Sequence, residues 1–384
     1  MKKTYLIVAM AVLVILVVGL TILNNHKTNN SSTNTDNTIT TAKIYSSRDL
    51  FTERDLAQTV DIETAMNYEV SDGNDIKITD EGIYVVSGTA QNVTIYIEAE
   101  DTDKVQIVLD GVSITNETMP CIYVKTADKV FITSTGNNTL KVTGNLVLDG
   151  STNLTGVIFS KQDITLNGTG TLNITSTENG IVGKDDLKIT GGTYNITSYD
   201  VAIKANDSIR IADGTITINA ETDGLHAENN DDDSLGYIYI GGGQIKINAG
   251  DDCIHGQSVV QIDDGTLNLN GVEGIEGTYI QINGGTIIIN ATDDGINAGS
   301  KSKKYEVTIE ITGGTITIVM ASGDTDGIDS NGNIIISGGT INVTGGSSFD
   351  YNGKATYTGG TIIINGVQVN SIPNQMTGGK GVRK

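Results

Sequence analysis

The chain has 384 residues, among them 47 glycines, two prolines and no tryptophan, and its formal net charge is −22 at pH 7. So negative a chain argues against nucleic acid as a partner, because a phosphate backbone is bound by a basic surface. The two cysteines, Cys121 and Cys253, lie far apart in the sequence, so we expect both to be unpaired and predict no structural zinc site.

The N-terminal residues predict export from the cell. Lys2 and Lys3 precede an uncharged apolar stretch from Tyr5 to Leu23, which is just long enough to cross a bilayer with the lysines left in the cytoplasm. Residues 1–23 are therefore predicted to be either a signal peptide or an uncleaved membrane anchor. Residues 24–43, rich in Asn, Thr and Ser, form a predicted disordered linker. The rest of the chain is expected to be extracellular, at the cell surface.

Residues 46–57, with the sequence SSRDLFTERDLA, predict a short helix whose Leu50, Phe51 and Leu56 face inward. The end coil of a stacked repeat exposes unpaired strand edges and tends to aggregate. We therefore expect this helix to cap the first coil of the domain that follows.

A repeat dominates the chain, and residues 44–372 are predicted to form one parallel β-helix. Gly-Gly-Thr or a variant recurs at intervals of 20 to 22 residues, with longer intervals where residues are inserted. Between these turns apolar and polar residues alternate, as at Ile209, Ile211, Ile216 and Ile218, which indicates strands with one buried face. Three strands and three turns in about 21 residues make one coil of this all-β fold. Residues 373–384 carry few apolar side chains and are predicted to be a flexible tail.

Stacked coils lie about 4.8 Å apart, so equivalent residues of successive coils should form columns. A column of Thr and Asn can hydrogen-bond along the stack, and we interpret it as a solvated structural face. A second, mixed column could line a polysaccharide groove, where Tyr237, Tyr239 and Tyr279 would stack on sugars. The Thr/Asn column is Thr175, Thr197, Asn219, Asn248, Asn270, Asn290, Val319, Thr344 and Asn365. The mixed column is Lys188, Arg210, Tyr239, Gln261, Gln281 and Glu310.

A third set of side chains, around the turns of Asp-Gly type, is acidic. Just before these turns lie Asp223, Asp252, Glu273, Asp294 and Asp326, with Asp251, Asp293 and Asp324 one or two residues earlier. After the turns, the outward residues are His226, His255, Glu276, Asn297 and Asp329. A separate acidic loop contains Asp231 and Asp232.

Stacked carboxylates require a compensating charge. Two like charges about 4.8 Å apart repel by roughly 3 kcal/mol at an effective dielectric constant of 20. A raised pKa needs burial, whereas a turn is expected to be exposed, and this stretch of turns contains almost no lysine. We therefore predict bound Ca²⁺, which takes about 6–8 oxygen ligands. The alternative is that the side chains splay into water and are screened by salt. The histidines do not indicate zinc, because each is expected to stand alone among oxygens.

Several segments resemble the bacterial carbohydrate-binding β-helix family, over about residues 45–376. They include LFTERDLAQT, VQIVLDGVSITN, GVIFSKQDITLNGTGTLNIT, GLHAENNDDDSLGYIYI and GDTDGIDSNGN. The founding member is a clostridial cell-surface protein that binds cellulose and polygalacturonate. The resemblance implies a right-handed parallel β-helix with bound Ca²⁺, similar in shape to polysaccharide lyases but acting as a binding module. Cys253, where a turn glycine is expected, and Gln244, in place of Thr, are departures that should loosen one coil locally.

These observations favour a monomeric, extracellular polysaccharide-binding protein for pectin or polygalacturonate, with cellulose as a second candidate. The predicted carbohydrate-binding residues are Lys204, Arg210, His226, Tyr237, Tyr239 and His255. One alternative is a calcium-dependent polysaccharide lyase, in which Lys204 would be the base that removes the C5 proton. Another is a structural adhesin that calcium merely makes rigid. The membrane would be contacted only through residues 1–23.

Overall fold

The computed structural model describes residues 43–323 and 325–375, so the predictions for residues 1–42, for Asp324 and for residues 376–384 lie outside the described residues. The described residues, 43–323 and 325–375, belong to one compact unit. Its main sheet has 34 strands, nearly all parallel, and the described helices, α2 (Ser47–Leu50) and α3 (Glu53–Leu56), have four residues each. The predicted all-β fold with a parallel sheet is confirmed. No helix in the described part of the chain has both the length and the apolar character needed to span a membrane.

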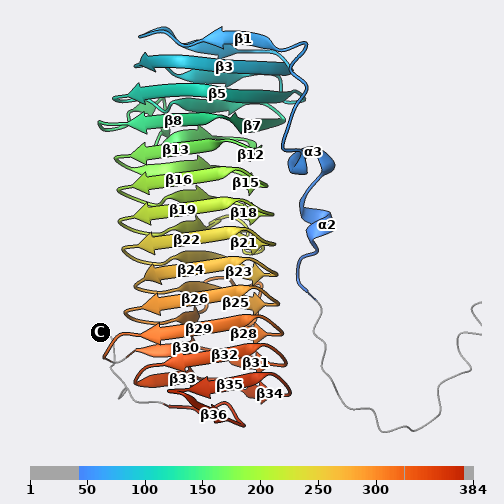
Figure 1. The fold of residues 1–384 in the computed structure, drawn as a ribbon, viewed down its shortest axis with the longest axis vertical. Helices are drawn as coiled ribbons and strands as arrows, with labels where there is room; N and C mark the ends of the chain where they lie inside the picture. The colour runs from blue at the N-terminus through green and yellow to red at the C-terminus, as the bar shows by residue number, and fades with distance from the viewer. Residues whose placement is uncertain (1–42, 324, 376–384) are drawn as a thin grey trace, which may run out of the picture. The chain divides into compact units, whose positions relative to one another are not determined.

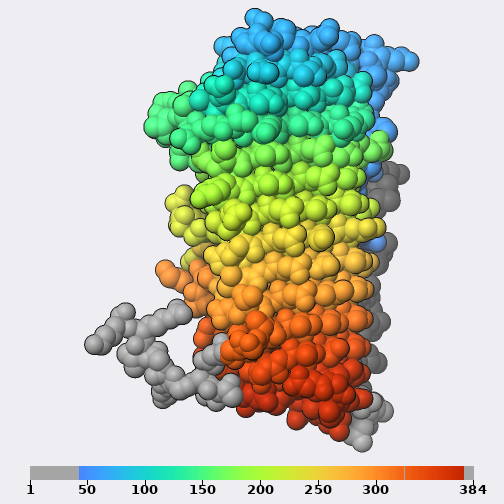
Figure 2. Space-filling model, turned by 60° about the vertical axis from the view of Figure 1, so that its left-hand side comes forward, coloured from blue at the N-terminus to red at the C-terminus, as the bar shows by residue number. Residues whose placement is uncertain are grey.

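The strands follow one another as stacked coils, coloured in sequence order from blue to red in Figures 1 and 2. The first coils contain β1 (Met66–Glu69), β2 (Ile76–Ile78), β3 (Gly82–Gln91), β4 (Ile95–Glu98), β5 (Lys104–Asn116), β6 (Ile122–Thr126), β7 (Lys129–Thr135) and β8 (Asn137–Val142). A separate antiparallel hairpin consists of β9 (Leu148–Asp149) and β10 (Thr152–Asn153). The next coils contain β11 (Gly156–Ser160), β12 (Asp163–Gly168), β13 (Thr171–Ser176), β14 (Asn179–Gly183), β15 (Asp186–Ile189), β16 (Thr193–Ser198), β17 (Ile203–Ala205), β18 (Ser208–Ile211), β19 (Thr215–Ala220), β20 (Leu225–Ala227), β21 (Tyr237–Ile240) and β22 (Gln244–Ala249).

The later coils continue the same order of strands. They contain β23 (Ile254–Ile262), β24 (Thr266–Gly271), β25 (Ile275–Ile282), β26 (Thr286–Ala291), β27 (Ile296–Ala298), β28 (Thr308–Ile311), β29 (Thr315–Met320), β30 (Asp326–Ser330), β31 (Asn333–Ile336), β32 (Thr340–Thr344), β33 (Ser347–Tyr351), β34 (Ala355–Tyr357), β35 (Thr361–Ile364) and β36 (Val367–Val369). The last pair, β35 and β36, is antiparallel and ends the sheet.

The alternating sequence pattern explains why each coil buries one face. In the coil of β17, β18 and β19, the side chains of Ile209, Ile211, Ile216 and Ile218 are all fully buried in the common core. Gly214 joins β18 to β19 with a φ of +136°, a backbone conformation that residues with a Cβ rarely adopt. Each of the three strands pairs in register with the equivalent strand of the next coil.

The predicted columns are confirmed by this register. In the Thr/Asn column, the Nδ2 of Asn248 donates to the Oδ1 of Asn219 at 2.8 Å, and the Nδ2 of Asn270 donates to Asn248 at 3.1 Å. Asn290 in turn donates to Asn270 at 2.8 Å. These bonds join residues that are 29, 22 and 20 positions apart, so an inserted segment does not break the column. Cys121 and Cys253 are both buried and unpaired, as expected.

Residues 43–60, which we call the N-terminal strap, lie lengthwise along the side of the coils (Figure 1). The backbone N of Tyr45 donates to the Oε1 of Gln261 at 2.7 Å, and the Nε2 of Gln58 donates to the carbonyl of Thr190 at 2.9 Å. The prediction that this segment caps the first coil is therefore wrong. Leu50, which is 7% exposed, faces inward as predicted, and Phe51 is partly buried against the same cluster. Leu56 lines the pocket between this segment and the coils but remains 48% exposed.

The C-terminal boundary of the fold lies later than predicted. The backbone N of Gln375 donates to the carbonyl of Phe349 at 2.9 Å, and its Oε1 accepts from the backbone N of Ser348 at 2.9 Å. Asn374 donates to the carbonyl of Tyr351 at 3.0 Å. Residues 373–375 therefore belong to the folded domain, and the predicted flexible tail from residue 373 begins too early.

Candidate functional site

The mixed column does not line an open groove, because the N-terminal strap covers it. Tyr239 is 1% exposed and Tyr237 is 6% exposed, and the ring of Tyr237 stacks on that of Tyr45 at 4.4 Å between centroids. Arg210 is held by Asp186, with 2.6 Å between Nη2 and Oδ2. The prediction that Arg210, Tyr237 and Tyr239 present a sugar-binding surface is therefore wrong for this arrangement of the strap. It failed because the register predicts which residues share a column but not what is packed over that column.

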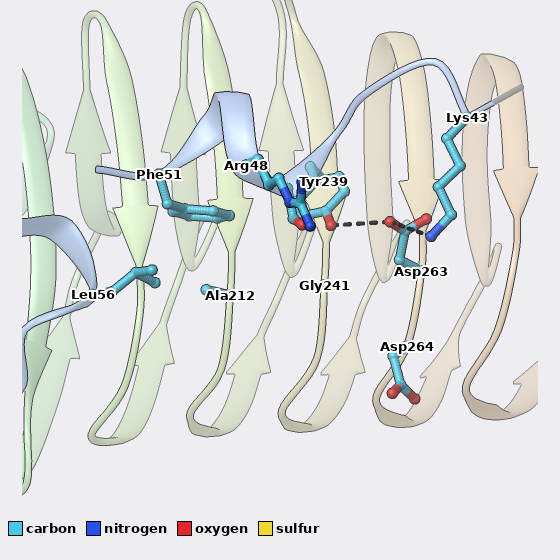
Figure 3. Close-up of a pocket in the computed structure, with 10 residues that line it drawn as sticks. Lys43, Arg48, Phe51, Leu56, Ala212, Tyr239, Gly241, Asp263 and Asp264 are labelled. Atoms are coloured by element: carbon cyan, nitrogen blue, oxygen red, sulfur yellow. Dashed lines mark hydrogen bonds and ion pairs between the residues drawn. The ribbon is translucent and has the colours of Figure 1, made fainter. Parts of the chain in front are cut away.

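A pocket of about 470 Å³ lies between the N-terminal strap and the coils (Figure 3). Its partly buried charge, Asp263, is already compensated, since Lys43 Nζ lies 2.9 Å from its Oδ2. The hydroxyl of Tyr239 donates to the same carboxylate at 3.0 Å, and Asn283 donates to its other oxygen at 2.8 Å. Burial alone would raise the pKa of Asp263, but these bonds hold the pKa below its ordinary value. A carboxylate with all its partners in place has little capacity left for a ligand.

The acidic side chains, by contrast, form two adjacent columns with an incomplete set of partners. The first column precedes the turns and the second follows them, three residues later in the chain. The turn between them breaks the alternation and brings the two side chains of a coil together, since the Nδ1 of His226 lies 2.6 Å from Asp223 and that of His255 lies 2.9 Å from Asp252. The first column is Asp223, Asp252, Glu273, Asp294 and Asp326, stacked by backbone hydrogen bonds. The second column is Lys204, His226, His255, Glu276, Asn297, Asp329 and Asp350, in register along β17, β20, β23, β25, β27, β30 and β33.

The turns that carry these columns are less exposed than expected. Asp223, Asp252 and Glu276 are 8%, 7% and 6% exposed. Burial disfavours the charged form of a carboxyl group and raises the pKa of Asp252 to about 6, a shift that we had not expected at a turn. We call Asp223, His226, Asp252, His255 and Glu276 the earlier half of the columns, and Glu273, Asp294, Asn297, Asp326, Asp329 and Asp350 the later half. The two halves differ in how the charge of their carboxylates is compensated.

The later half of the columns contains oxygen ligands only. Burial, with the charges of Glu276 and Asp252, raises the pKa of Glu273 to about 8. Burial raises the pKa of Asp294 to about 7, despite a backbone hydrogen bond that lowers it. Burial and the charge of Asp350 raise the pKa of Asp329 to about 6.

Among the described residues of this half, two buried oxygens have no hydrogen-bond partner in the protein. They are the Oδ1 atoms of Asn297 and Asp350, whereas the Nδ2 of Asn297 donates to Glu273 at 3.1 Å. The ion pairs that the described residues make with the columns all fall in the other half, at His226, His255 and Lys301. Negative charge and unpartnered oxygens therefore coincide around Glu273, Asp294, Asn297, Asp329 and Asp350.

The earlier half of the columns contains two histidines that lie face to face. The rings of His226 and His255 are parallel within 8°, with centroids 4.5 Å apart. The Nδ1 of His226 lies 2.6 Å from Asp223 Oδ2, and the Nδ1 of His255 lies 2.9 Å from Asp252 Oδ2 and 2.7 Å from Glu276 Oε2. The expectation that each histidine stands alone among oxygens is therefore wrong.

Positive charge is also nearer to the columns than the sequence suggested. Lys301 Nζ lies 2.6 Å from Glu276 Oε1. Burial would lower the pKa of His255, but hydrogen bonds to Asp252 and Glu276 outweigh burial and raise the pKa to about 10. In the earlier half, protonated groups of the protein can therefore balance the carboxylates, which they do not do in the later half.

The remaining predicted metal ligands lie beside the columns. Asp251 and Asp293 precede the first column by one residue and are exposed. Asp231 and Asp232 are exposed in the loop between β20 and β21, where Asp232 accepts from the hydroxyl of Ser234 at 2.6 Å. The structure does not bring these four carboxylates into the groups that converge around His226 and His255.

Three further residues were not identified as candidates from the sequence. Asp350 continues the second column, and following the repeat for one more coil would have found it. Lys301 comes from an insert between β27 and β28, so no repeat position identifies it. Tyr199, 72% exposed, precedes by five residues the half-exposed Lys204 that begins the polar part of the second column. Its exposed ring is a candidate sugar contact, and the alternation that continues from β16, with Ser198 buried and Tyr199 outward, could have found it.

Comparison with known proteins agrees with this architecture. A family model described as carbohydrate-binding domain-containing protein matches residues 72–322 and 270–372. A protein of Acetivibrio thermocellus with the same description is 39% identical over 203 residues, which are 51% of this chain and 70% of the relative. A solved structure described as the polysaccharide lyase-like protein from C. thermocellum, in a gadolinium derivative, is 29% identical and has a TM-score of 0.50. The match covers 61% of this chain and 96% of the solved one. The chain therefore belongs to the family of carbohydrate-binding domain-containing proteins.

Proposed function

We propose that the protein binds an acidic polysaccharide outside the cell, through Ca²⁺ held by the later half of the two acidic columns. The observation that carries the proposal is the coincidence of raised carboxyl pKa values with the unpartnered oxygens of Asn297 and Asp350. Such a group is under-compensated, and a cation would satisfy both the charges and the oxygens. The proposal includes right-handed coils of about 21 residues and attachment to the cell surface through residues 1–23.

The chemistry of the donor set fits calcium. The candidate ligands are carboxylate and amide oxygens on consecutive coils, about 4.8 Å apart, and Ca²⁺ tolerates irregular sets of about 6–8 oxygens. The solved relative is a gadolinium derivative, and gadolinium is likewise a hard cation that prefers oxygen ligands. The residues that would hold calcium are Glu273, Asp294, Asn297, Asp326, Asp329 and Asp350.

A uronate polymer fits this surface better than a neutral glucan. Calcium can join the carboxylates of the protein to those of the sugar, which allows an anionic protein to hold an anionic chain. Lys204 and the exposed ring of Tyr199 would contact the same chain beyond the metal. Cellulose is the weaker candidate, because the chain lacks tryptophan and two of its tyrosines, Tyr237 and Tyr239, are buried.

The test is retention of the protein on insoluble polygalacturonate in a calcium-containing buffer and in the same buffer with a chelator in excess over calcium. We expect retention to need calcium and to be lost in the double variant Asp294→Asn with Asp329→Asn. The matched control is Asp264→Asn, which removes an exposed carboxylate away from the columns. Retention that a chelator leaves unchanged would show that calcium does not bridge the two partners.

A second candidate function is polysaccharide cleavage by β-elimination, favoured by the Asp223–His226 pair beside the proposed calcium ligands. With its Nδ1 held 2.6 Å from Asp223, His226 has the orientation of a general base, and Lys204 is its neighbour in the same column. The base would take the C5 proton of a uronate while the C4–O bond breaks, leaving a C4–C5 double bond. The absorbance of that unsaturated product separates cleavage from binding alone, and its absence during long incubation with calcium would exclude this function.

A further inference from the structure

The earlier half of the columns brings two imidazoles and three carboxylates into one group. Ligand atoms of Asp223, His226 and His255 all lie within 4.8 Å of one another, and so do those of Asp252, His255 and Glu276. His255 belongs to both sets, so they describe one connected site. This group adjoins the oxygen-only half proposed to bind calcium, because Glu276 and Glu273 belong to the same coil, but its donors include imidazole nitrogen.

The charges of this group leave room for a divalent cation. With both imidazoles neutral, Asp223, Asp252 and Glu276 contribute three negative charges, and Lys301, 2.6 Å from Glu276, contributes one positive charge. Glu228 adds a fourth carboxylate at the edge of the group, 3.4 Å from the Nε2 of His226, so negative charge remains in excess and a divalent cation would reduce it.

We propose that Asp223, His226 and His255 bind one divalent transition-metal ion, with Asp252 and Glu276 as the adjoining carboxylates. Imidazole nitrogen is a preferred ligand of zinc, copper and nickel, whereas calcium takes oxygen. The ligand atoms of Asp223, His226 and His255 already lie within 4.8 Å of one another, and a turn of the stacked imidazole rings out of parallel would direct both nitrogens to one ion. One pair of columns would then bind two kinds of metal, a transition-metal ion where the coils supply imidazole and Ca²⁺ where they supply only oxygen ligands.

The site is built by the stacking of coils. His226 and His255 are 29 residues apart, yet β20 and β23 pair them directly. The inserted residues form the loop that contains Asp231 and Asp232, outside the coil, so the insertion leaves the register intact. Carboxylates beside a ligating imidazole orient its ring and commonly change metal affinity by about 10–100-fold.

The experiment is equilibrium titration of the full chain, freed of any affinity tag, with Zn²⁺ in the presence of excess calcium. We expect one zinc per chain, and a loss of about tenfold or more in affinity for the double variant His226→Asn with His255→Asn. The matched control is His26→Asn, since the chain has three histidines and His26 lies outside the described residues. Unchanged zinc affinity in the double variant would overturn the proposal.

A spectroscopic measurement on the unmodified protein removes the question of whether the double variant folds. Electron paramagnetic resonance of the Cu²⁺ form should show hyperfine coupling to two nitrogens, and a spectrum with oxygen ligands alone would overturn the assignment. The double variant Asp294→Asn with Asp329→Asn should retain zinc, so failure of the calcium proposal is distinguishable from failure of this one. Zinc displaced by calcium would also count against the proposed site.

Discussion

Asp55 and Lys129 form a buried ion pair, with 2.5 Å between Oδ1 and Nζ, although they are 74 residues apart in the sequence. The Nζ of Lys188 lies 3.3 Å from the other carboxylate oxygen, and the hydroxyl of Thr165 donates to Oδ1 at 2.7 Å. The side chain of Asp55 is fully buried. This carboxylate fastens the N-terminal strap to three successive coils and thereby keeps the mixed column covered.

Replacing Asp55 by Ala should detach the strap. Removing one partner from a buried ion pair commonly costs about 3–5 kcal/mol. The observed loss should stay at or below the low end of that range, because a detached strap lets Lys129 and Lys188 regain water. Urea unfolding measures the change in stability, and trypsin cleavage at Arg48 or Arg54 reports detachment directly.

The matched control for that variant is Asp49→Ala, which removes an exposed carboxylate from the same strap. It should leave both unfolding and cleavage nearly unchanged. Equal cleavage rates for the two variants would show that Asp55 does not hold the strap.

The metal-free protein should lose stability as the pH rises from about 4 to about 8. The folded-state pKa values of Glu273, Asp294 and Asp329 are raised to about 8, 7 and 6, from ordinary values of 4.5, 3.8 and 3.8. In this window the folded state binds more protons than the unfolded state, so raising the pH favours unfolding. The loss should be at least about 1.4 kcal/mol, the equivalent of one pKa unit.

The measurement is Tm in a chelator at several pH values. Asp55 acts in the opposite sense and in a different window, because its pKa is lowered by hydrogen bonds from Lys129 and others that outweigh burial. Its contribution is lost only as the pH falls below the ordinary value of 3.8. A Tm that rises steadily from pH 5 to pH 8 without metal would contradict the raised pKa values of Glu273, Asp294 and Asp329.

Calcium should reverse the loss of stability at the higher pH. A ligand that binds only the folded state adds about 2.7 kcal/mol when its concentration is 100 times Kd. The double variant Asp294→Asn with Asp329→Asn should have a higher Tm than the native chain without metal, since two repelling charges are removed, but should no longer respond to calcium. An unchanged calcium response in that variant would place the ion elsewhere.

The Thr/Asn column should contribute to stability and not to binding. In Asn248→Asp the amide donor to Asn219 becomes a carboxylate oxygen facing another oxygen, so we expect a loss of about 1 kcal/mol. Retention on polygalacturonate should be unaffected. Weaker retention at equal folding would show that this face also contacts the polysaccharide.

The order of residues within the columns followed from the sequence. Period-two alternation and the recurring glycine turns predicted which residues stack, and the structure pairs Arg210 with Tyr239 and His226 with His255 as the repeat requires. Local preferences suffice for this, because each coil repeats the backbone of the one before it. The acidic columns were predictable for the same reason.

What lies over a column, and what compensates its charge, was decided only by the tertiary structure. The four-residue helices of the N-terminal strap are too short to show a periodic pattern. Asp55 binds Lys129 and Lys188, which lie 74 and 133 residues later in the chain. Lys301 reaches Glu276 from an insert whose position no repeat predicts. Burial and charge compensation depend on such contacts between distant segments, whereas register depends on short-range turn geometry and the pairing of neighbouring strands.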